Sequence, residues 1–199
     1  MKKLLTLIVA SGIALAAPAF AGSHGDEYAG DSYGLDKAHT SVGFSIRHMG
    51  ITNVRGLFGE YEGQVRLAGD DITTLSVKAT IQAASIDTNN DRRDDHLRSE
   101  DFFEVDTYPE ITFHSKEVVA HNDGYALVGD LTLKDVTKEV TLPVTMSAPV
   151  EDPWGGTRVG LEITGSVDRN DFGVAFDGAA DRMIGAMANF DINIQAIKE

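Results

Sequence analysis

Residues 41–67 have the sequence SVGFSIRHMGITNVRGLFGEYEGQVRL, and this stretch decides the fold. In its first part, apolar residues recur at every second position, which is typical of a strand with one buried face. That expected face carries Val42, Phe44, Ile46 and His48. The alternation continues over residues 57–67, where Leu57, Val65 and Leu67 are expected to share a face. Gly59 and Gly63 indicate bends or bulges within the strand.

The same period of two recurs along the rest of the chain. Further strands are predicted at residues 77–81, 111–113, 127–133, 140–146, 159–167 and 186–196. Turn-forming sequences separate them, among them Asn122-Asp123-Gly124 and Asp152-Pro153-Trp154-Gly155-Gly156. About eight strands with short connections predict an all-β antiparallel sandwich or barrel.

Residues 91–101 interrupt the strands, because eight of these eleven residues are charged. Asn90 is placed to cap a short helix that turns Leu97 inward. Ser99 is placed to cap a second turn, after which Phe102 and Phe103 return to the core. The sequence therefore predicts one short helical insert in a β-protein.

The N-terminus has the pattern of a secretory signal peptide. Lys2 and Lys3 precede a short apolar run, and Ala19-Phe20-Ala21 forms a small-residue cleavage site. The apolar run is short for a membrane anchor, which takes about 20 apolar residues. We therefore expect a signal peptide at 1–21, a flexible polar arm at 22–32 and one domain at 33–199. This arrangement predicts a periplasmic protein without a segment inserted in the membrane.

The chain of 199 residues carries a formal net charge of −14 and no cysteine. The charge argues against a nucleic-acid partner, because phosphate binding needs a basic surface. It also weakens general attraction to anionic membranes, so that any lipid transfer would need a docking partner or a local patch. The absence of cysteine excludes disulfides and thiolate chemistry.

The usual catalytic signatures are missing: the sequence has no G-x-S-x-G, H-E-x-x-H, P-loop or G-x-G-x-x-G motif. Isolated histidines are more often structural than catalytic. An acid–base site built from His39, His48 or His96 with nearby carboxylates is kept as the alternative. No metal site and no catalytic residue are assigned.

Several segments in order along the chain resemble the signature sequences of the YceI-like family. They are residues 33–50 (YGLDKAHTSVGFSIRHMG), 85–89 (SIDTN), 93–103 (RDDHLRSEDFF), 108–113 (YPEITF), 129–138 (GDLTLKDVTK), 152–156 (DPWGG) and 169–173 (RNDFG). One departure is Asp135, where the family often has glycine, and it affects only a turn.

The resemblance implies an extended, eight-stranded, antiparallel, lipocalin-like β-barrel with a lipid in its lumen. It further implies an exported bacterial protein that binds a polyisoprenoid, an isoprenoid quinone or another long-chain amphiphilic lipid, and that forms homodimers. No cofactor is implied other than this bound isoprenoid lipid or quinone as ligand.

Candidate binding residues follow from this expected lumen. The apolar candidates are Phe44, Ile46, Phe58, Leu97, Phe102, Phe103, Ile111, Phe113, Phe172, Phe176 and Met183. The candidates for the polar end are His48, Arg55, Arg92 and His96. Asp94, Arg98 and Ser99 are interpreted as structural residues that hold the insert against the barrel, and residues 169–183 as a rim.

Three functions are consistent with these observations. The leading hypothesis is a protein that sequesters or carries an isoprenoid lipid. The alternatives are an enzyme acting on such a lipid, and a stress-protective protein with a filled barrel and no ligand. The residues alone do not distinguish a hollow barrel from a filled one.

Overall fold

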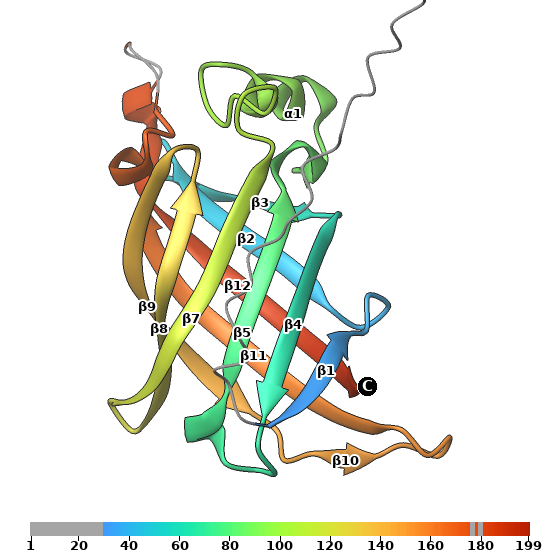
Figure 1. The fold of residues 1–199 in the computed structure, drawn as a ribbon. Helices are drawn as coiled ribbons and strands as arrows, with labels where there is room; N and C mark the ends of the chain where they lie inside the picture. Colours follow the sequence, from blue (N-terminus) through green and yellow to red (C-terminus); the bar gives the residue numbers. More distant parts are fainter. Residues whose placement is uncertain (1–29, 176–177, 179–180) are drawn as a thin grey trace, which may run out of the picture.

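The alternating segments form strands in the computed structural model, which describes residues 30–175, 178 and 181–199 (Figure 1). The strands are β1 (Asp31–Leu35), β2 (Ser41–His48), β3 (Thr52–Phe58), β4 (Tyr61–Leu67), β5 (Ser76–Gln82), β6 (Ile86–Asp87), β7 (Glu110–His121), β8 (Gly124–Leu133), β9 (Val136–Met146), β10 (Val150–Glu151), β11 (Thr157–Asp168) and β12 (Ile184–Lys198). The helices are α1 (Asp91–Arg98) and four short 3₁₀ helices, η1 (Ile72–Thr74), η2 (Ala83–Ser85), η3 (Arg169–Phe172) and η4 (Asp181–Met183).

The strands close into an antiparallel barrel, as predicted. Around the barrel the order is β11, β9, β8, β7, β5, β4, β1 and β12, and β12 pairs again with β11. The outer edge of β12 pairs with β1 at its C-terminal end and with β2 over most of its length. Because β1 continues into β2 and β3 into β4, the two pairs act as two bent strands of an eight-stranded barrel.

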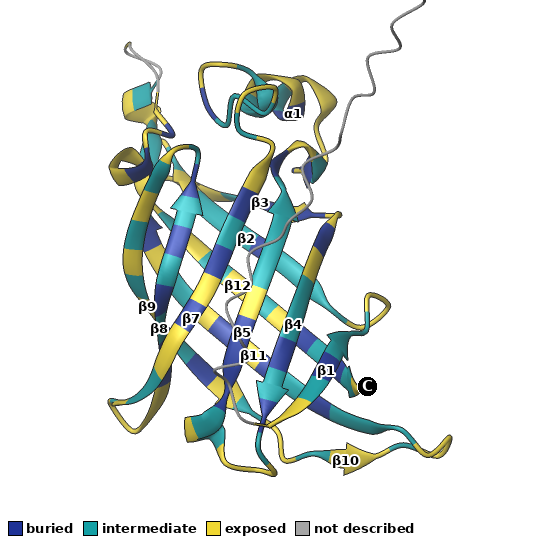
Figure 2. Cartoon of the chain, viewed as in Figure 1, coloured by how far each residue is buried: buried dark blue, intermediate teal, exposed yellow. Residues whose placement is uncertain are grey.

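The predicted alternation over residues 57–67 is wrong at one point. The strand breaks at Gly59 and Glu60, so Leu57 lies outside with 54% of its surface exposed while Phe58 is buried. At this corner the backbone N–H of Gly59 donates to the carbonyl of Ser85 at 3.1 Å, directly beyond the β3–β6 pairing. The bend reverses which residues face inward, and a strict period of two does not follow it. Beyond such corners the strands show the expected bands of buried and exposed residues (Figure 2).

The predicted helical insert is present and lies over one end of the barrel (Figure 1). Asn90 caps α1, since its side-chain oxygen accepts a hydrogen bond from the backbone N–H of Arg93 at 3.0 Å. The buried Asp94 carboxylate accepts hydrogen bonds from the backbone N–H and the hydroxyl of Thr88. Arg98 donates to the carbonyls of Ala84 and Ile86, both at 2.8 Å. These contacts fasten the insert to the strand that precedes it.

The predicted signal peptide and most of the predicted arm, 22–32, lie outside the described residues. The first strand begins at Asp31, two residues before the expected domain boundary. Asp31 is held by an ion pair with Lys198 at 2.6 Å, which ties the start of the barrel to its last strand. Among the described residues, no helix combines the length and apolar character needed to cross a membrane.

Candidate functional site

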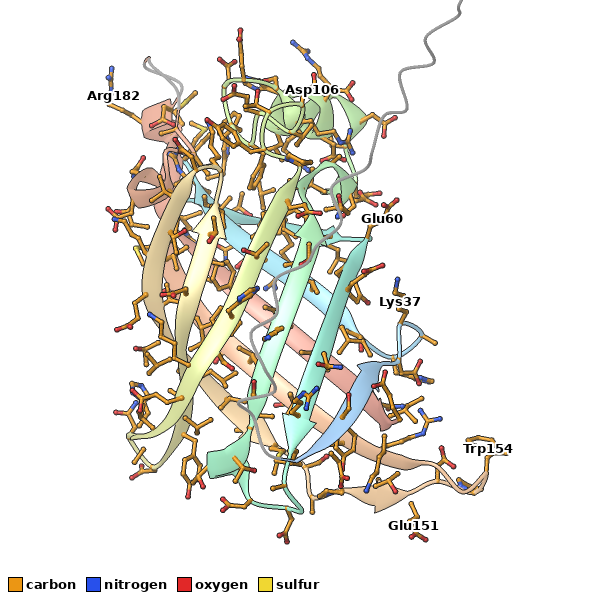
Figure 3. The ribbon with its side chains drawn as sticks, in the orientation of Figure 1. Lys37, Glu60, Asp106, Glu151, Trp154 and Arg182 are labelled. Atoms are coloured by element: carbon orange, nitrogen blue, oxygen red, sulfur yellow. The ribbon has the colours of Figure 1, made fainter. Side chains whose placement is uncertain are left out.

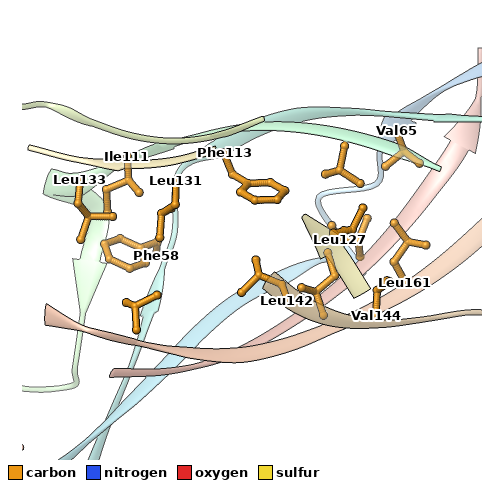
Figure 4. Close-up of a cluster of buried hydrophobic side chains, with 14 of the residues drawn as sticks. Phe58, Val65, Ile111, Phe113, Leu127, Leu131, Leu133, Leu142, Val144 and Leu161 are labelled. Atoms are coloured by element: carbon orange, nitrogen blue, oxygen red, sulfur yellow. The ribbon is translucent and has the colours of Figure 1, made fainter. Parts of the chain in front are cut away.

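The barrel interior is solid at one end. Side chains from β1, β4, β8 and β11 meet near the base and exclude solvent almost completely, with exposed fractions of 2% or less for Tyr33, Val65, Leu67, Leu127, Val159 and Leu161. Figure 4 shows Val65, Leu127, Val144 and Leu161 in one group, and Phe58, Ile111, Leu131 and Leu133 in another. The base group forms a packed floor.

Above this floor the barrel encloses a cavity of about 140 Å³. Ala79, Ile81, Phe190 and Ile192 point into it and are only half-buried, although they belong to the interior of the barrel. Interior side chains remain accessible in this way only where neighbouring atoms are missing. The filled-barrel alternative predicts an interior without a cavity, and this feature therefore counts against it.

The cavity wall is almost entirely carbon. Its residues with polar side chains are Thr40, Tyr61 and Glu62, all near the corners where β1 passes to β2 and β3 to β4. The Tyr61 hydroxyl donates to the carbonyl of Thr40 at 2.6 Å, and burial raises the pKa of this phenol. The Thr40 hydroxyl donates to the carbonyl of Gln195 and accepts from its backbone N–H. The wall therefore suits an apolar ligand that needs no hydrogen bonds.

Aromatic rings cross the cavity at the end beneath the insert. The Phe44 and Phe58 ring centroids lie 5.5 Å apart, and Phe103 of the insert meets Phe58 edge-on at 6.0 Å. Phe44 occupies the space opposite Gly56, where an added Cβ would lie 2.5 Å from the ring. The three rings form the roof of the cavity, and the absence of a side chain at Gly56 leaves room for the ring of Phe44.

Five of the predicted apolar site residues line the cavity: Phe44, Phe58, Phe103, Ile111 and Phe113. Leu97, Phe102 and Phe172 instead pack into the core around the insert and η3. Ile46 lies farther along β2, and Met183 is exposed on η4. Phe176 lies outside the described residues. Which of these residues contact a ligand stays a prediction.

The four residues predicted for the polar end lie away from the cavity wall and do not gather at one place. His48 lies at the end of β2, Arg92 is exposed on α1, and His96 bonds to Asp101 at 2.8 Å. Arg55 lines a second hollow of about 690 Å³ along β2, β3 and β12, which shares Phe44 and Phe190 with the cavity wall. Among the described residues, no three His, Asp or Glu side chains are grouped so that they could hold a metal ion.

A charged network lies at the corner between β1 and β2. The Asp36 carboxylate accepts hydrogen bonds from His39 at 2.9 Å and from Arg158 at 2.7 Å. These two contacts lower the pKa of Asp36 to about 2. Arg158 also bonds to Asp152 at 2.6 Å, and the Gly156 N–H and Arg158 lower the pKa of that carboxyl. Two signature segments far apart in sequence are thus joined beside Thr40 of the cavity wall.

The signature segment at residues 169–173 also has a structural role. The Arg169 side chain is 5% exposed and donates to the carbonyls of Val174 at 2.7 Å and Gly185 at 3.0 Å. It pairs with Asp181 at 2.8 Å. Arg169 therefore holds the two described ends of the predicted rim together.

Comparison with known proteins agrees with this architecture. The family model described as the YceI-like domain matches residues 33–196. A UPF0312 protein of Serratia proteamaculans is 40% identical over 167 residues, covering 83% of this chain and 86% of that protein. A UPF0312 protein of Staphylococcus aureus is 36% identical over 169 residues, covering 84% and 96% respectively.

Solved structures show the same barrel. The Campylobacter jejuni YCEI protein aligns with a TM-score of 0.68 at 30% identity, covering 83% of this chain and 96% of that one. Burkholderia cenocepacia BcnA aligns with a TM-score of 0.72 at 23% identity, covering 81% and 98%. From the family match, the relatives and the closed barrel together, this chain belongs to the YceI-like family.

Proposed function

We propose that this protein binds a long-chain isoprenoid, or a similar amphiphilic lipid, inside the barrel and so sequesters or carries it. The observation that carries the proposal is the apolar cavity between the packed floor and the aromatic roof. A structural neighbour from Saccharophagus degradans, similar in fold at 16% identity and a TM-score of 0.61, is titled a polyisoprenoid binding domain, which supports the proposal.

The energetics favour an apolar chain over a polar one. Burial of each methylene contributes roughly 0.8 kcal/mol, and the wall offers few free polar atoms to select anything else. The cavity is similar in size to one of roughly 150 Å³ that accepts a benzene-sized molecule. A longer tail therefore requires the rings of Phe44, Phe58 and Phe103 to move aside, and we propose that the roof opens in this way.

We further propose that the protein acts in the periplasm and is not an enzyme. The pattern at residues 1–21 supports export. The histidines of the enzymatic alternative occupy three separate places: His39 bonds to Asp36, His48 ends β2, and His96 bonds to Asp101 on the insert. Because the three histidines lie apart, they do not form a common acid–base site.

Native mass spectrometry of the purified full chain, before and after organic extraction, tests the ligand. We expect an adduct that extraction removes and that added prenyl quinone restores. Ala79→Phe places a ring in the cavity and should abolish binding while the protein stays folded. Ala120→Phe makes the same change at an exposed position of β7 and should leave binding intact.

Three results would overturn this proposal. They are a protein that neither carries nor takes up lipid, an Ala79→Phe variant that binds as well as the parent, and turnover of the lipid that disappears when His39, His48 or His96 is replaced by alanine.

A further inference from the structure

An exposed apolar surface lies at the end of β2, where the β2–β3 turn meets η4. The backbone N–H of Met49 donates to the carbonyl of Met183 at 2.6 Å, which holds the two segments side by side. Ile51, Met49 and Met183 are 73%, 54% and 41% exposed. We call this surface, together with Arg47 and Arg182, the tip.

The tip is basic in a chain that is strongly acidic overall. Arg47 is exposed and bonds to neutral acceptors, the carbonyl of Gly50 at 3.0 Å and the side-chain oxygen of Asn53 at 3.4 Å. Arg182 is exposed, extends outward in Figure 3, and forms no ion pair with the described residues. The neighbouring carboxylate of Asp181 is paired with Arg169.

The other prominent apolar site has the opposite charge. Trp154 and Val150, on the hairpin of β10 and β11, are 84% and 58% exposed, and Glu151 and Asp152 accompany them. Figure 3 shows Trp154 and Arg182 at opposite corners of the molecule. An anionic surface would therefore attract the tip and repel this hairpin.

From this geometry we propose that the tip docks the protein on a lipid bilayer that contains anionic phospholipid. Met49, Ile51 and Met183 enter the boundary between headgroups and acyl chains, and Arg47 and Arg182 lie against the phosphates. A few protruding side chains suit insertion into lipid, whereas a stable protein partner needs a contact area of about 20 to 30 residues on each side.

The tip is also connected to the cavity through the inward face of β2. Val42 and Phe44 line the cavity, and Ile46 continues the same face, paired in register with the cavity residue Ala188. Beyond it, Ile184 pairs with His48 at the tip. Docking does not depend on what the cavity holds. Passage of a lipid along this face requires a lipid in the cavity, and this part of the inference therefore rests on the function proposed above.

Flotation of the full chain with vesicles tests the docking. We expect binding to phosphatidylethanolamine vesicles that contain phosphatidylglycerol, and much weaker binding to phosphatidylcholine alone. Ile51→Asp should reduce binding at least about tenfold, because apolar burial is lost. Arg47→Gln and Arg182→Gln should each reduce it about fivefold. Val150→Asp is the matched control at the opposite end and should change binding by less than about twofold.

The outcomes separate the two proposals. Docking is overturned if the parent protein binds neutral and anionic vesicles equally or not at all, if Ile51→Asp binds like the parent, or if Val150→Asp is equally damaging. Native mass spectra of the same samples report the cavity ligand independently. Loss of vesicle binding by Ile51→Asp supports docking whether or not lipid occupies the cavity.

Discussion

At the scale of single residues, charged groups from distant parts of the chain join at the corner between β1 and β2. Asp36 is bonded to His39, Arg158 and Gln195, and its pKa falls from 3.8 to about 2. A carboxyl whose pKa is lower in the folded protein stabilises the fold when it is ionised. Asp36 therefore links the stability of this corner to pH.

We expect Asp36→Asn to lower the unfolding temperature at pH 6, and the difference from the parent to shrink in acid. Above its unfolded pKa near 4 the full contribution of Asp36 is present, and it is lost as the pH falls toward about 2. Calorimetry of both proteins from about pH 6 to about pH 2 measures this. Asp70→Asn, at an exposed site, is the control and should show no such trend. A constant difference down to pH 2 would contradict the assignment.

At the scale of elements, the helical insert depends on a buried carboxylate. Asp94 is 4% exposed, and removal of its side chain would leave the Thr88 N–H and hydroxyl without their acceptor. Arg93 also bonds to Thr88, with its Nε 2.7 Å from the hydroxyl oxygen. The base of α1 is therefore a small polar network in which each member needs the others.

Asp94→Ala should destabilise the protein by about 2–3 kcal/mol, because hydrogen bonds to a charged group are lost and buried donors stay unpaired. Urea unfolding measures the change. Asp95→Ala, one residue along α1, is the matched control. Asp95 is 79% exposed and contacts Arg98 at 3.3 Å, so its loss should cost less than about 0.5 kcal/mol. Equal effects of the two substitutions would contradict a special role for Asp94.

The elements also show how far the sequence could predict the fold. Period-two alternation predicted the strands, and the charge-rich segment after Asn90 predicted the insert, because both are local patterns. The reversal of faces between Leu57 and Phe58 was not predictable, since it depends on pairing between Gly59 and the distant Ser85. Likewise, the Asp36–Arg158 contact joins residues whose proximity only the closed barrel produces.

At the scale of the whole molecule, the barrel is packed at its base and hollow above it. Residues such as Phe58 and Ile111 could be predicted as interior, but which interior residues face free space depends on how all the strands tilt and pack together. The resemblance to the family implied the lumen, whereas the size of the cavity and its aromatic roof required the structure.

Removal of the proposed lipid should destabilise the whole barrel, because a ligand that binds only the folded protein stabilises it by mass action. Ligand at 100 times its dissociation constant adds about 2.7 kcal/mol to the free energy of unfolding. In a domain of this size, that raises the unfolding temperature by about 5–10 °C. Differential scanning calorimetry of extracted and reloaded protein measures the shift. Ala79→Phe should show no shift, and a shift in that variant would place the lipid elsewhere.

The pairing of β12 along both of its edges has a consequence for how the barrel closes. β12 pairs with β11 along one edge and with both β1 and β2 along the other. The barrel therefore cannot close until this fifteen-residue strand has paired with β1 and β2, which come first in the chain. Closure joins parts of the chain that lie far apart in sequence, which makes it a slow folding step, and until it occurs the edges of β1, β2 and β11 that face β12 stay unpaired.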